Sequence, residues 1–207
     1  PLMQLPTVLH VASAADLTQR TPYLTADPGR VAALRDELQL EPAVRHVGIA
    51  WHGNRENARE RWRAAPLPAW APLSGVPGMR FHSLQLDATP AELAEAPFPL
   101  RPTHERIHDM EDTAALATLM DLIVTVDTAI VHLAGALGRP TWMPDSLLTE
   151  YRWGTDRTDS PWYPSLRIFR QHHRDDWTPV FAEIAVALAT PSRDRRPPAE
   201  QKRKSEQ

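Results

Sequence analysis

Residues 122–140 constrain the fold of this chain more than any other segment. The segment opens with a short apolar run, residues 122–126, which predicts a buried strand that ends at Asp127 and Thr128. A helical pattern follows at once, because apolar residues share one face at Ile130, Leu133, Ala134 and Leu137. Gly138 and Pro140 then supply a stop signal. The segment therefore predicts a strand that turns directly into a helix.

Such a turn exposes the free N–H groups of the helix N-terminus, where the positive end of the helix dipole also lies. In a parallel α/β sheet, ligands bind at this end of the strands. Asp127, Thr128 and His132 place a carboxylate, a hydroxyl and an imidazole at the same end of the helix. We therefore expect a phosphate-bearing small molecule here. A structural interpretation competes with this one, because Asp and Thr cap helices in any α/β domain and a lone helical His is more often structural or exposed.

The rest of the chain alternates between strand and helix patterns. We expect further strands at residues 46–51, 79–85, 106–108, 141–143 and 166–169. We expect further helices at residues 28–40, 67–73, 91–95, 112–120 and 180–189. Asp27 would cap the first of these helices, with Pro28 at its first position. This rhythm predicts an α/β fold, with a parallel sheet that carries helices on both faces.

The composition excludes several classes of protein. The chain has no cysteine, which rules out disulfides, thiolate metal sites and a thiol nucleophile. Its formal net charge of −3 argues against nucleic-acid binding as a main role. The longest apolar region, residues 114–137, is broken by Asp121, Asp127 and His132, so it predicts no membrane span. The first residues lack the features of a signal peptide, and we expect a cytoplasmic protein.

The sequence divides into three parts. Residues 1–25 are loop-like and are interpreted as a segment that connects two domains. Residues 26–190 would form the α/β domain. Residues 191–207 change to Arg, Pro, Glu, Lys and Ser, a composition that predicts a disordered tail. The absence of an initiator methionine suggests a fragment of a longer protein.

No pattern predicts a metal site or a cofactor. Asp109 and Asp112 are better explained as helix caps than as metal ligands. His104 and His108 have helical spacing, but a Pro-rich loop precedes an expected strand there, which makes them poor candidates for a metal site.

Four stretches together resemble glycosyltransferase family 9, the heptosyltransferase-like enzymes. The most specific stretch contains the strand-to-helix turn and reads Val126-Asp-Thr-Ala-Ile-Val-His-Leu-Ala-Gly-Ala-Leu-Gly-Arg-Pro140. The other three are residues 47–54, 109–116 and 159–170. The likeness covers nearly the whole chain, up to residue 189. It is to the C-terminal half of these enzymes, in the version found behind tetratricopeptide repeats in bacterial proteins.

This resemblance implies the two-domain glycosyltransferase B architecture. The chain would be its Rossmann-like half, which binds a nucleoside diphosphate sugar as donor. An N-terminal domain absent from this chain would hold the acceptor and usually the catalytic base, accompanied by tetratricopeptide repeats in the repeat-containing version. The implied reaction is an inverting transfer of the sugar to a hydroxyl group, and the fragment alone would be inactive.

The resemblance also assigns roles to residues of the turn. Asp127 would face the sugar or the phosphates. His132 would lie beside the diphosphate and stabilise the leaving group, so both are the candidate catalytic residues. Thr128 and Ala129 would contact the diphosphate through a hydroxyl and an amide, and Ile130 is counted with them as substrate-binding.

Residues outside the turn would complete the donor site. Met110 would pack on the nucleobase, with the backbone near Asp109 reading its edge, and Gln85 or Asp87 would reach the ribose. The phosphate side of the cleft would be lined by Trp51, His52, Gly53 and Asn54. Many relatives have a lysine in the loop that follows, where this chain offers arginines instead. Arg61 is the one selected as a phosphate ligand from Arg55, Arg59, Arg61 and Arg63.

Two other functions stay open. The chain could be a non-catalytic nucleotide-binding or scaffold module, which an N-terminal domain with a catalytic base in the native gene would argue against. Nucleotide-sugar epimerases share the architecture, but they usually carry several acidic and His residues around the cleft. Here only His132 and Asp127 are well placed, so the epimerase function is the less favoured alternative.

Overall fold

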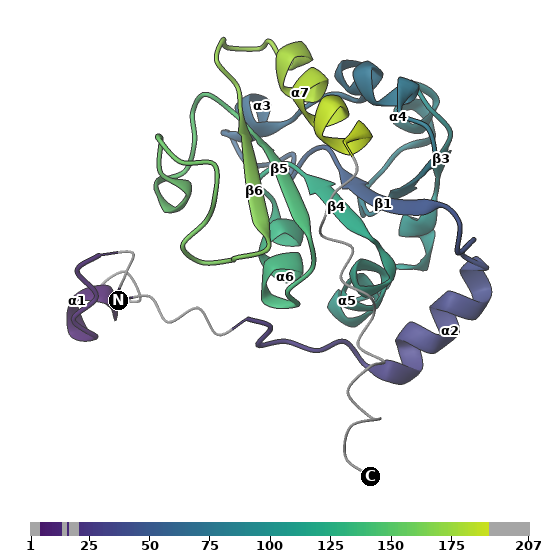
Figure 1. Cartoon of the computed structure of the whole chain (residues 1–207), viewed down its shortest axis with the longest axis horizontal. Helices are drawn as coiled ribbons and strands as arrows, with labels where there is room; N and C mark the ends of the chain where they lie inside the picture. The colour runs from purple at the N-terminus through teal and green to yellow at the C-terminus, as the bar shows by residue number, and fades with distance from the viewer. Residues whose placement is uncertain (1–4, 14–15, 17–20, 191–207) are drawn as a thin grey trace.

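The structure is a computed structural model, and it describes residues 5–13, 16 and 21–190. Within these residues, six strands form one parallel sheet in the order β3-β2-β1-β4-β5-β6 (Figure 1). The strands are β1 Arg45–Ala50, β2 Met79–Ser83, β3 Leu100–Arg101, β4 Leu122–Thr125, β5 Thr141–Asp145 and β6 Leu166–Arg170. The predicted α/β class and parallel sheet are confirmed.

Helices cover both faces of this sheet, as predicted. On one face lie α2 Pro28–Leu38, α5 Met110–Leu119 and α6 Ala129–Ala136, which share a core cluster with Ala50 and Ile123 of the sheet (Figure 1). On the other face, the 3₁₀ helix η3 Leu67–Gly75 and α7 Thr178–Ala189 share a cluster with Val47, Ile49 and Val124. The shorter helical segments are α1 Leu5–Val8, α3 Glu60–Arg63, α4 Pro90–Ala94, η4 Thr103–Arg106 and η5 Tyr151–Trp153.

Side-chain caps determine where the main helices begin. Asp27 accepts a hydrogen bond from the Arg30 N–H at 2.8 Å, and α2 starts at Pro28 as predicted. Asp109 accepts from the Asp112 N–H at 2.8 Å and caps α5 two residues earlier than expected. These contacts support the interpretation of Asp109 as a cap.

The third strand was predicted at the wrong place. Residues 103–106 form η4, and the strand is Leu100–Arg101, inside the segment expected to be a Pro-rich loop. Pro99 and Pro102 flank it, and prolines are tolerated in edge strands because these pair on one side only. β3 is such an edge and pairs with β2 alone. The prolines concealed this strand from the sequence pattern.

The fifth strand is longer than predicted, because it continues through Pro144 to Asp145. Only Thr141 and Trp142 of β5 pair with β4, whereas the whole of β5 pairs with β6. Pro144 therefore lies beyond the part of β5 that has neighbours on both sides, where its missing N–H costs less. As a result, Asp145 lies at the carboxyl edge of the sheet.

The segments outside the sheet were tested only in part. Tyr23 and Leu24 donate backbone hydrogen bonds to the Ala136 carbonyl at the end of α6, at 2.9 and 3.2 Å. The predicted disorder of residues 191–207 lies outside the described residues, and the division at residues 25 and 190 stays a prediction. In the described part of the chain, no helix is long and apolar enough to cross a bilayer.

The strand order determines where a ligand can bind. From the neighbouring pair β1 and β4, the chain proceeds outward to β2 and β3 on one side and to β5 and β6 on the other. In doubly wound sheets of this order, the crevice outside the carboxyl ends of the central strands is the binding position. The turn after β4, at Asp127, and the turn after β1, at Trp51, meet there, so the Asp127 turn lies at a central strand as predicted.

Candidate functional site

Thr128 shapes the start of α6. Its hydroxyl oxygen accepts a hydrogen bond from the Ile130 N–H at 3.2 Å and lies 3.1 Å from the hydroxyl oxygen of Thr125. This cap leaves the first turn of the helix facing the carboxyl edge of the sheet, with Ala129 as its first residue. Backbone amides and a hydroxyl at the start of a helix are groups that can bind an anion.

Asp127 connects the turn after β4 to the loop after β1. Its carboxylate is 6% exposed, and its Oδ2 lies 3.8 Å from Nη1 of Arg63. Nη2 of Arg63 donates to Oε2 of Glu60 at 2.8 Å, and Oε1 of Glu60 accepts from the Gly53 N–H. The turn after β4 and the turn after β1 are thus joined by a series of contacts through Arg63 and Glu60.

His132 lies one turn into α6, in an aromatic setting. Its Nδ1 is 3.0 Å from the Tyr163 hydroxyl oxygen, and its ring stacks on Trp153 with centroids 5.2 Å apart. Burial lowers the pKa of His132, the nearby Arg152 lowers it further, and Asp127 opposes both. His132 is therefore neutral at pH 7, and it acts there as a hydrogen-bonding group and not as a cation.

Gln85 supports the turn after β1. Its Oε1 accepts from the Trp51 and His52 N–H groups, both at 3.1 Å, and its Nε2 donates to Oδ1 of Asp87 at 2.8 Å. Gln85 is buried, and both of its amide atoms are engaged within the protein. Asp87 is half-exposed and also accepts from Nε of Arg55 at 3.1 Å. Of the two candidates for the ribose contact, Asp87 is the accessible one.

A pocket of about 650 Å³ lies beside the same turn. Its walls include Trp51, His52, Glu60, Arg61, Trp62 and Glu92. The α6 turn is not among its walls, but Glu60, which lines the pocket, connects it to Asp127 through Arg63. The guanidinium of Arg61 lies over the Trp62 ring, 4.2 Å from its centroid. Arg63 is the arginine of this loop that contacts Asp127, and the phosphate role of Arg61 stays a prediction.

Met110 and Asp109 lie where α5 begins. α5 packs beside α6 on the same face of the sheet, so both N-termini are at the carboxyl edge. Met110 is 56% exposed, which leaves its thioether free to contact a flat ring. Asn54 has a local role, because its Oδ1 accepts from the Glu56 N–H at 2.9 Å and shapes the loop after β1. The binding roles of these residues stay predictions.

Two charged residues at this edge were missed by the sequence analysis. Asp145, at the end of β5, is buried and accepts from Nη1 of Arg170 at 2.6 Å. Burial raises the pKa of Asp145 to about 6, with the Asp127 charge adding to the shift and Arg170 opposing it. Arg152 lies in η5, a 3₁₀ turn that no sequence pattern predicted. The strand that ends in Asp145 was expected to stop before Pro144, so its last carboxylate was not considered.

Comparisons with known proteins find a family model, a curated relative and solved structures that are similar to this chain. Residues 108–188 match the family described as glycosyltransferase family 9 (heptosyltransferase). Protein FlbA of Caulobacter vibrioides is 32% identical over 190 residues, which are 89% of this chain and 31% of FlbA. The chain therefore spans about a third of the length of this curated relative.

Among solved structures, ADP-heptose LPS heptosyltransferase II of E. coli superposes with a TM-score of 0.57 at 17% identity. The match covers 86% of this chain and 57% of that one. At this identity the likeness shows the fold, which is the α/β fold of glycosyltransferase B structures.

Proposed function

We propose that the chain, whose residues 108–188 match glycosyltransferase family 9 (heptosyltransferase), is the donor-binding half of an inverting glycosyltransferase. The donor would be a nucleoside diphosphate sugar, and the acceptor would be a hydroxyl group. The E. coli neighbour is named for ADP-heptose, which is a donor of this class. That this chain uses a donor of the same class, together with a hydroxyl acceptor, is part of the proposal.

The observation that carries the proposal is the turn into α6 at the centre of the sheet. The diphosphate would bind the first amides of α6 and the Thr128 hydroxyl, where the helix dipole favours an anion. Arg63 and Arg152 flank this position, since Arg63 contacts Asp127 and Arg152 acts on His132. Guanidinium groups at such a site form charge-assisted hydrogen bonds to phosphate.

The same groups would act in the chemical step. The acceptor oxygen attacks the anomeric carbon, the bond from that carbon to the β-phosphate oxygen breaks, and negative charge develops on the departing diphosphate. Dipoles already oriented toward this charge stabilise the transition state more than the bound donor. The base that takes the acceptor proton would come from the acceptor-binding domain.

The remaining parts of the donor would extend along the carboxyl edge. Met110 would cover one face of the nucleobase, and Asp87 would accept a hydrogen bond from the ribose. The pocket beside Trp51 and His52 would take the sugar, because its volume suits a small ligand and Trp62 lines it. Asp127 would lie between the sugar and the phosphates.

A thermal-shift panel tests this proposal. ADP, UDP, GDP and their sugars are added to the chain, and a matched nucleotide should raise the unfolding temperature because it binds only the folded state. Arg63→Gln should reduce that increase. The matched control is Arg80→Gln, which removes an arginine paired with Glu41 near the amino end of β2. The proposal fails if no nucleotide raises the unfolding temperature, or if both variants respond alike.

A further inference from the structure

His132 is held by two aromatic residues from the long connection between β5 and β6. Tyr163 contributes the hydroxyl 3.0 Å from Nδ1, and Trp153 contributes the stacked ring, inclined by 22° to the imidazole. Both aromatic side chains are buried. The imidazole thus has one nitrogen occupied by the protein, and its other nitrogen, Nε2, lies on the opposite side of the ring.

Gly135 makes this contact possible. A Cβ at position 135 would lie 2.3 Å from Cγ of Tyr163 and 2.4 Å from its Cδ1. Only a residue without a side chain therefore lets the Tyr163 ring approach α6 closely, one turn after His132. The missing side chain of Gly135 and the ring of Tyr163 are therefore complementary in shape.

The connection that supplies Trp153 is itself anchored. Nη2 of Arg170 donates to the Trp153 carbonyl at 2.7 Å, and Nη1 of Arg170 donates to Asp145 at 2.6 Å. The hydroxyl oxygen of Ser160 accepts from the Tyr163 N–H at 3.3 Å. The backbone of each aromatic residue beside His132 is therefore anchored by a hydrogen bond to a side chain.

We propose that Tyr163 is a positioning residue that donates its hydroxyl proton to Nδ1 of His132, which fixes the imidazole as the Nε2–H tautomer. This inference extends the proposed function, because the Nε2–H then donates to an oxygen of the departing diphosphate. The opposite tautomer would turn a lone pair toward an anion, which is repulsive. A hydrogen bond to the other nitrogen is the usual means by which proteins select a histidine tautomer.

The charges around the ring agree with a neutral donor. Burial, and then the neighbouring Tyr23, raise the pKa of the Tyr163 hydroxyl, which therefore keeps its proton. Arg152 and Asp127 are the charged groups that act on His132, and they do so in opposite directions. The imidazole remains neutral and able to donate through Nε2 at the pH where the diphosphate is charged.

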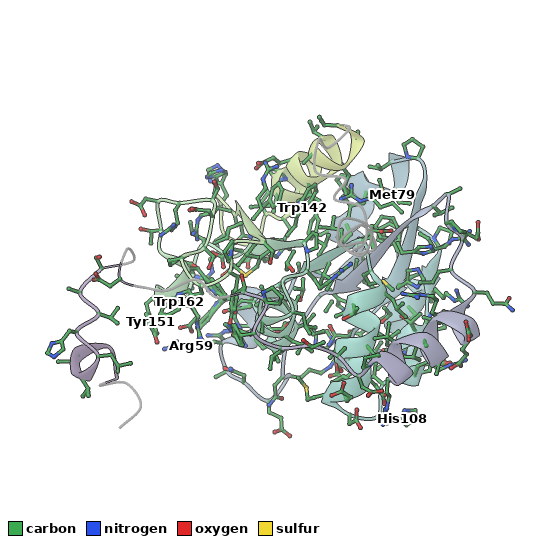
Figure 2. The ribbon with its side chains drawn as sticks, turned by 60° about the horizontal axis from the view of Figure 1, so that its bottom comes forward. Arg59, Met79, His108, Trp142, Tyr151 and Trp162 are labelled. Atoms are coloured by element: carbon green, nitrogen blue, oxygen red, sulfur yellow. The ribbon has the colours of Figure 1, made fainter. Side chains whose placement is uncertain are left out.

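The tautomer can be read from the chain by ¹⁵N NMR of labelled histidine. The His132 signals should show a protonated Nε2 and an unprotonated, hydrogen-bonded Nδ1 at pH 7. In Tyr163→Phe the Nδ1 signal should lose this hydrogen-bonded position. Tyr151→Phe is the control, because Tyr151 lies in the same connection but is 73% exposed (Figure 2). A protonated Nδ1 in the wild-type chain, or an unchanged signal in Tyr163→Phe, would overturn the proposal.

A double-mutant cycle on ADP affinity tests the consequence. If a third of the Tyr163→Phe molecules keep the productive tautomer, ADP affinity falls about threefold. In a His132→Ala background the same change should have no effect, because Tyr163 acts through His132. Equal losses in both backgrounds would show a merely structural role. If ADP fails to bind the wild-type chain, the proposed function fails, while the ¹⁵N spectrum still reports the tautomer.

Discussion

At the scale of single residues, Thr128 caps a helix and is also the hydroxyl that we propose contacts the diphosphate. Thr128→Ala removes the acceptor for the Ile130 N–H, and loss of such a cap costs about 1 kcal/mol of unfolding free energy. A lost hydrogen bond to a charged group costs about 1.5–3 kcal/mol of binding. We expect ADP binding, measured by calorimetry, to weaken more than folding, measured by urea unfolding.

The matched control for Thr128→Ala is Thr89→Ala, which removes the threonine cap of α4. It should lower the unfolding free energy by a similar amount and leave ADP affinity unchanged. If both variants lose stability alone, Thr128 is only a cap and does not contact the diphosphate.

The residues of the site differ in how well sequence could assign them. Thr128 and Asp127 lie in one continuous segment, so local pattern and family resemblance both pointed to them. Tyr163 lies 31 residues after its partner His132, a pairing that no local periodicity encodes. The stacking of His132 on Trp153, 21 residues later in the chain, is likewise a contact that no local pattern encodes.

At the scale of elements, α6 depends on close contact with the connection between β5 and β6. Gly135→Ala places a methyl group inside van der Waals distance of the Tyr163 ring. Alanine favours a helix over glycine by about 1 kcal/mol, but overpacking a filled core costs about 1–3 kcal/mol. We expect a net loss of unfolding free energy in urea titrations.

Gly75→Ala is the control for this substitution, because a Cβ at position 75 meets no atom within 4 Å. It should leave the unfolding free energy nearly unchanged. A Gly135→Ala chain as stable as the wild type would mean that the Tyr163 ring moves away easily, which would contradict a fixed contact with His132.

Two neighbouring histidines in β1 and β2 predict that the stability of the fold depends on pH. His82 in β2 is fully buried, and its Nε2 lies 2.9 Å from Nδ1 of His46 in β1. Burial, followed by the charge of His46, lowers the pKa of His82 from 6.5 to about 3. Between these two pH values the unfolded chain binds a proton that the folded chain does not, so stability falls as the pH drops from 6.5 toward 3.

Urea unfolding at a series of pH values measures this dependence. His82→Gln cannot take up the proton, so its unfolding free energy should fall less between pH 6.5 and 4 than that of the wild type. Asp145 acts in the opposite direction, because its pKa is raised from 3.8 to about 6 and acid favours its buried form. If the unfolding free energies of the wild type and of His82→Gln fall equally with pH, His82 accepts a proton in the folded state.

Most strands and helices could be predicted from the sequence. The exceptions show which physical information the sequence pattern lacks. β4 is an apolar run, β1 is mostly apolar, β2 and β6 alternate in part between apolar and polar residues, and the caps of α2, α4 and α5 carry Asp or Thr. β3 and the end of β5 contain or adjoin prolines, which local rules assign to loops. Only the position of a strand within the sheet determines whether a proline is tolerated there.

At the scale of the whole molecule, the described residues provide one of the two surfaces that the proposed reaction requires. The proposed donor diphosphate would contact backbone amides, a hydroxyl and arginines at the carboxyl edge. The acceptor base is assigned to another domain. We therefore expect the purified chain to bind a nucleoside diphosphate with a free energy of about −4 to −8 kcal/mol, which corresponds to millimolar to micromolar affinity.

The same chain should not transfer a sugar. Incubation with nucleotide sugars and hydroxyl acceptors, followed by mass spectrometry, should show no glycosylated product. The control adds an acceptor-binding domain, which the proposal requires, to the same substrates. Transfer by the purified chain alone would contradict this division of labour between two domains.

The central claim, that a diphosphate binds at the start of α6, is tested most directly by an amide-resolved NMR titration with ADP. The account predicts that the largest shifts occur at the Ala129 and Ile130 amides, with smaller shifts near Met110 and along the loop after β1. Thr128→Ala should reduce them all at a given ADP concentration. Shifts confined to the amino edge of the sheet, or saturable binding that leaves the Ala129 and Ile130 amides unmoved, would contradict it.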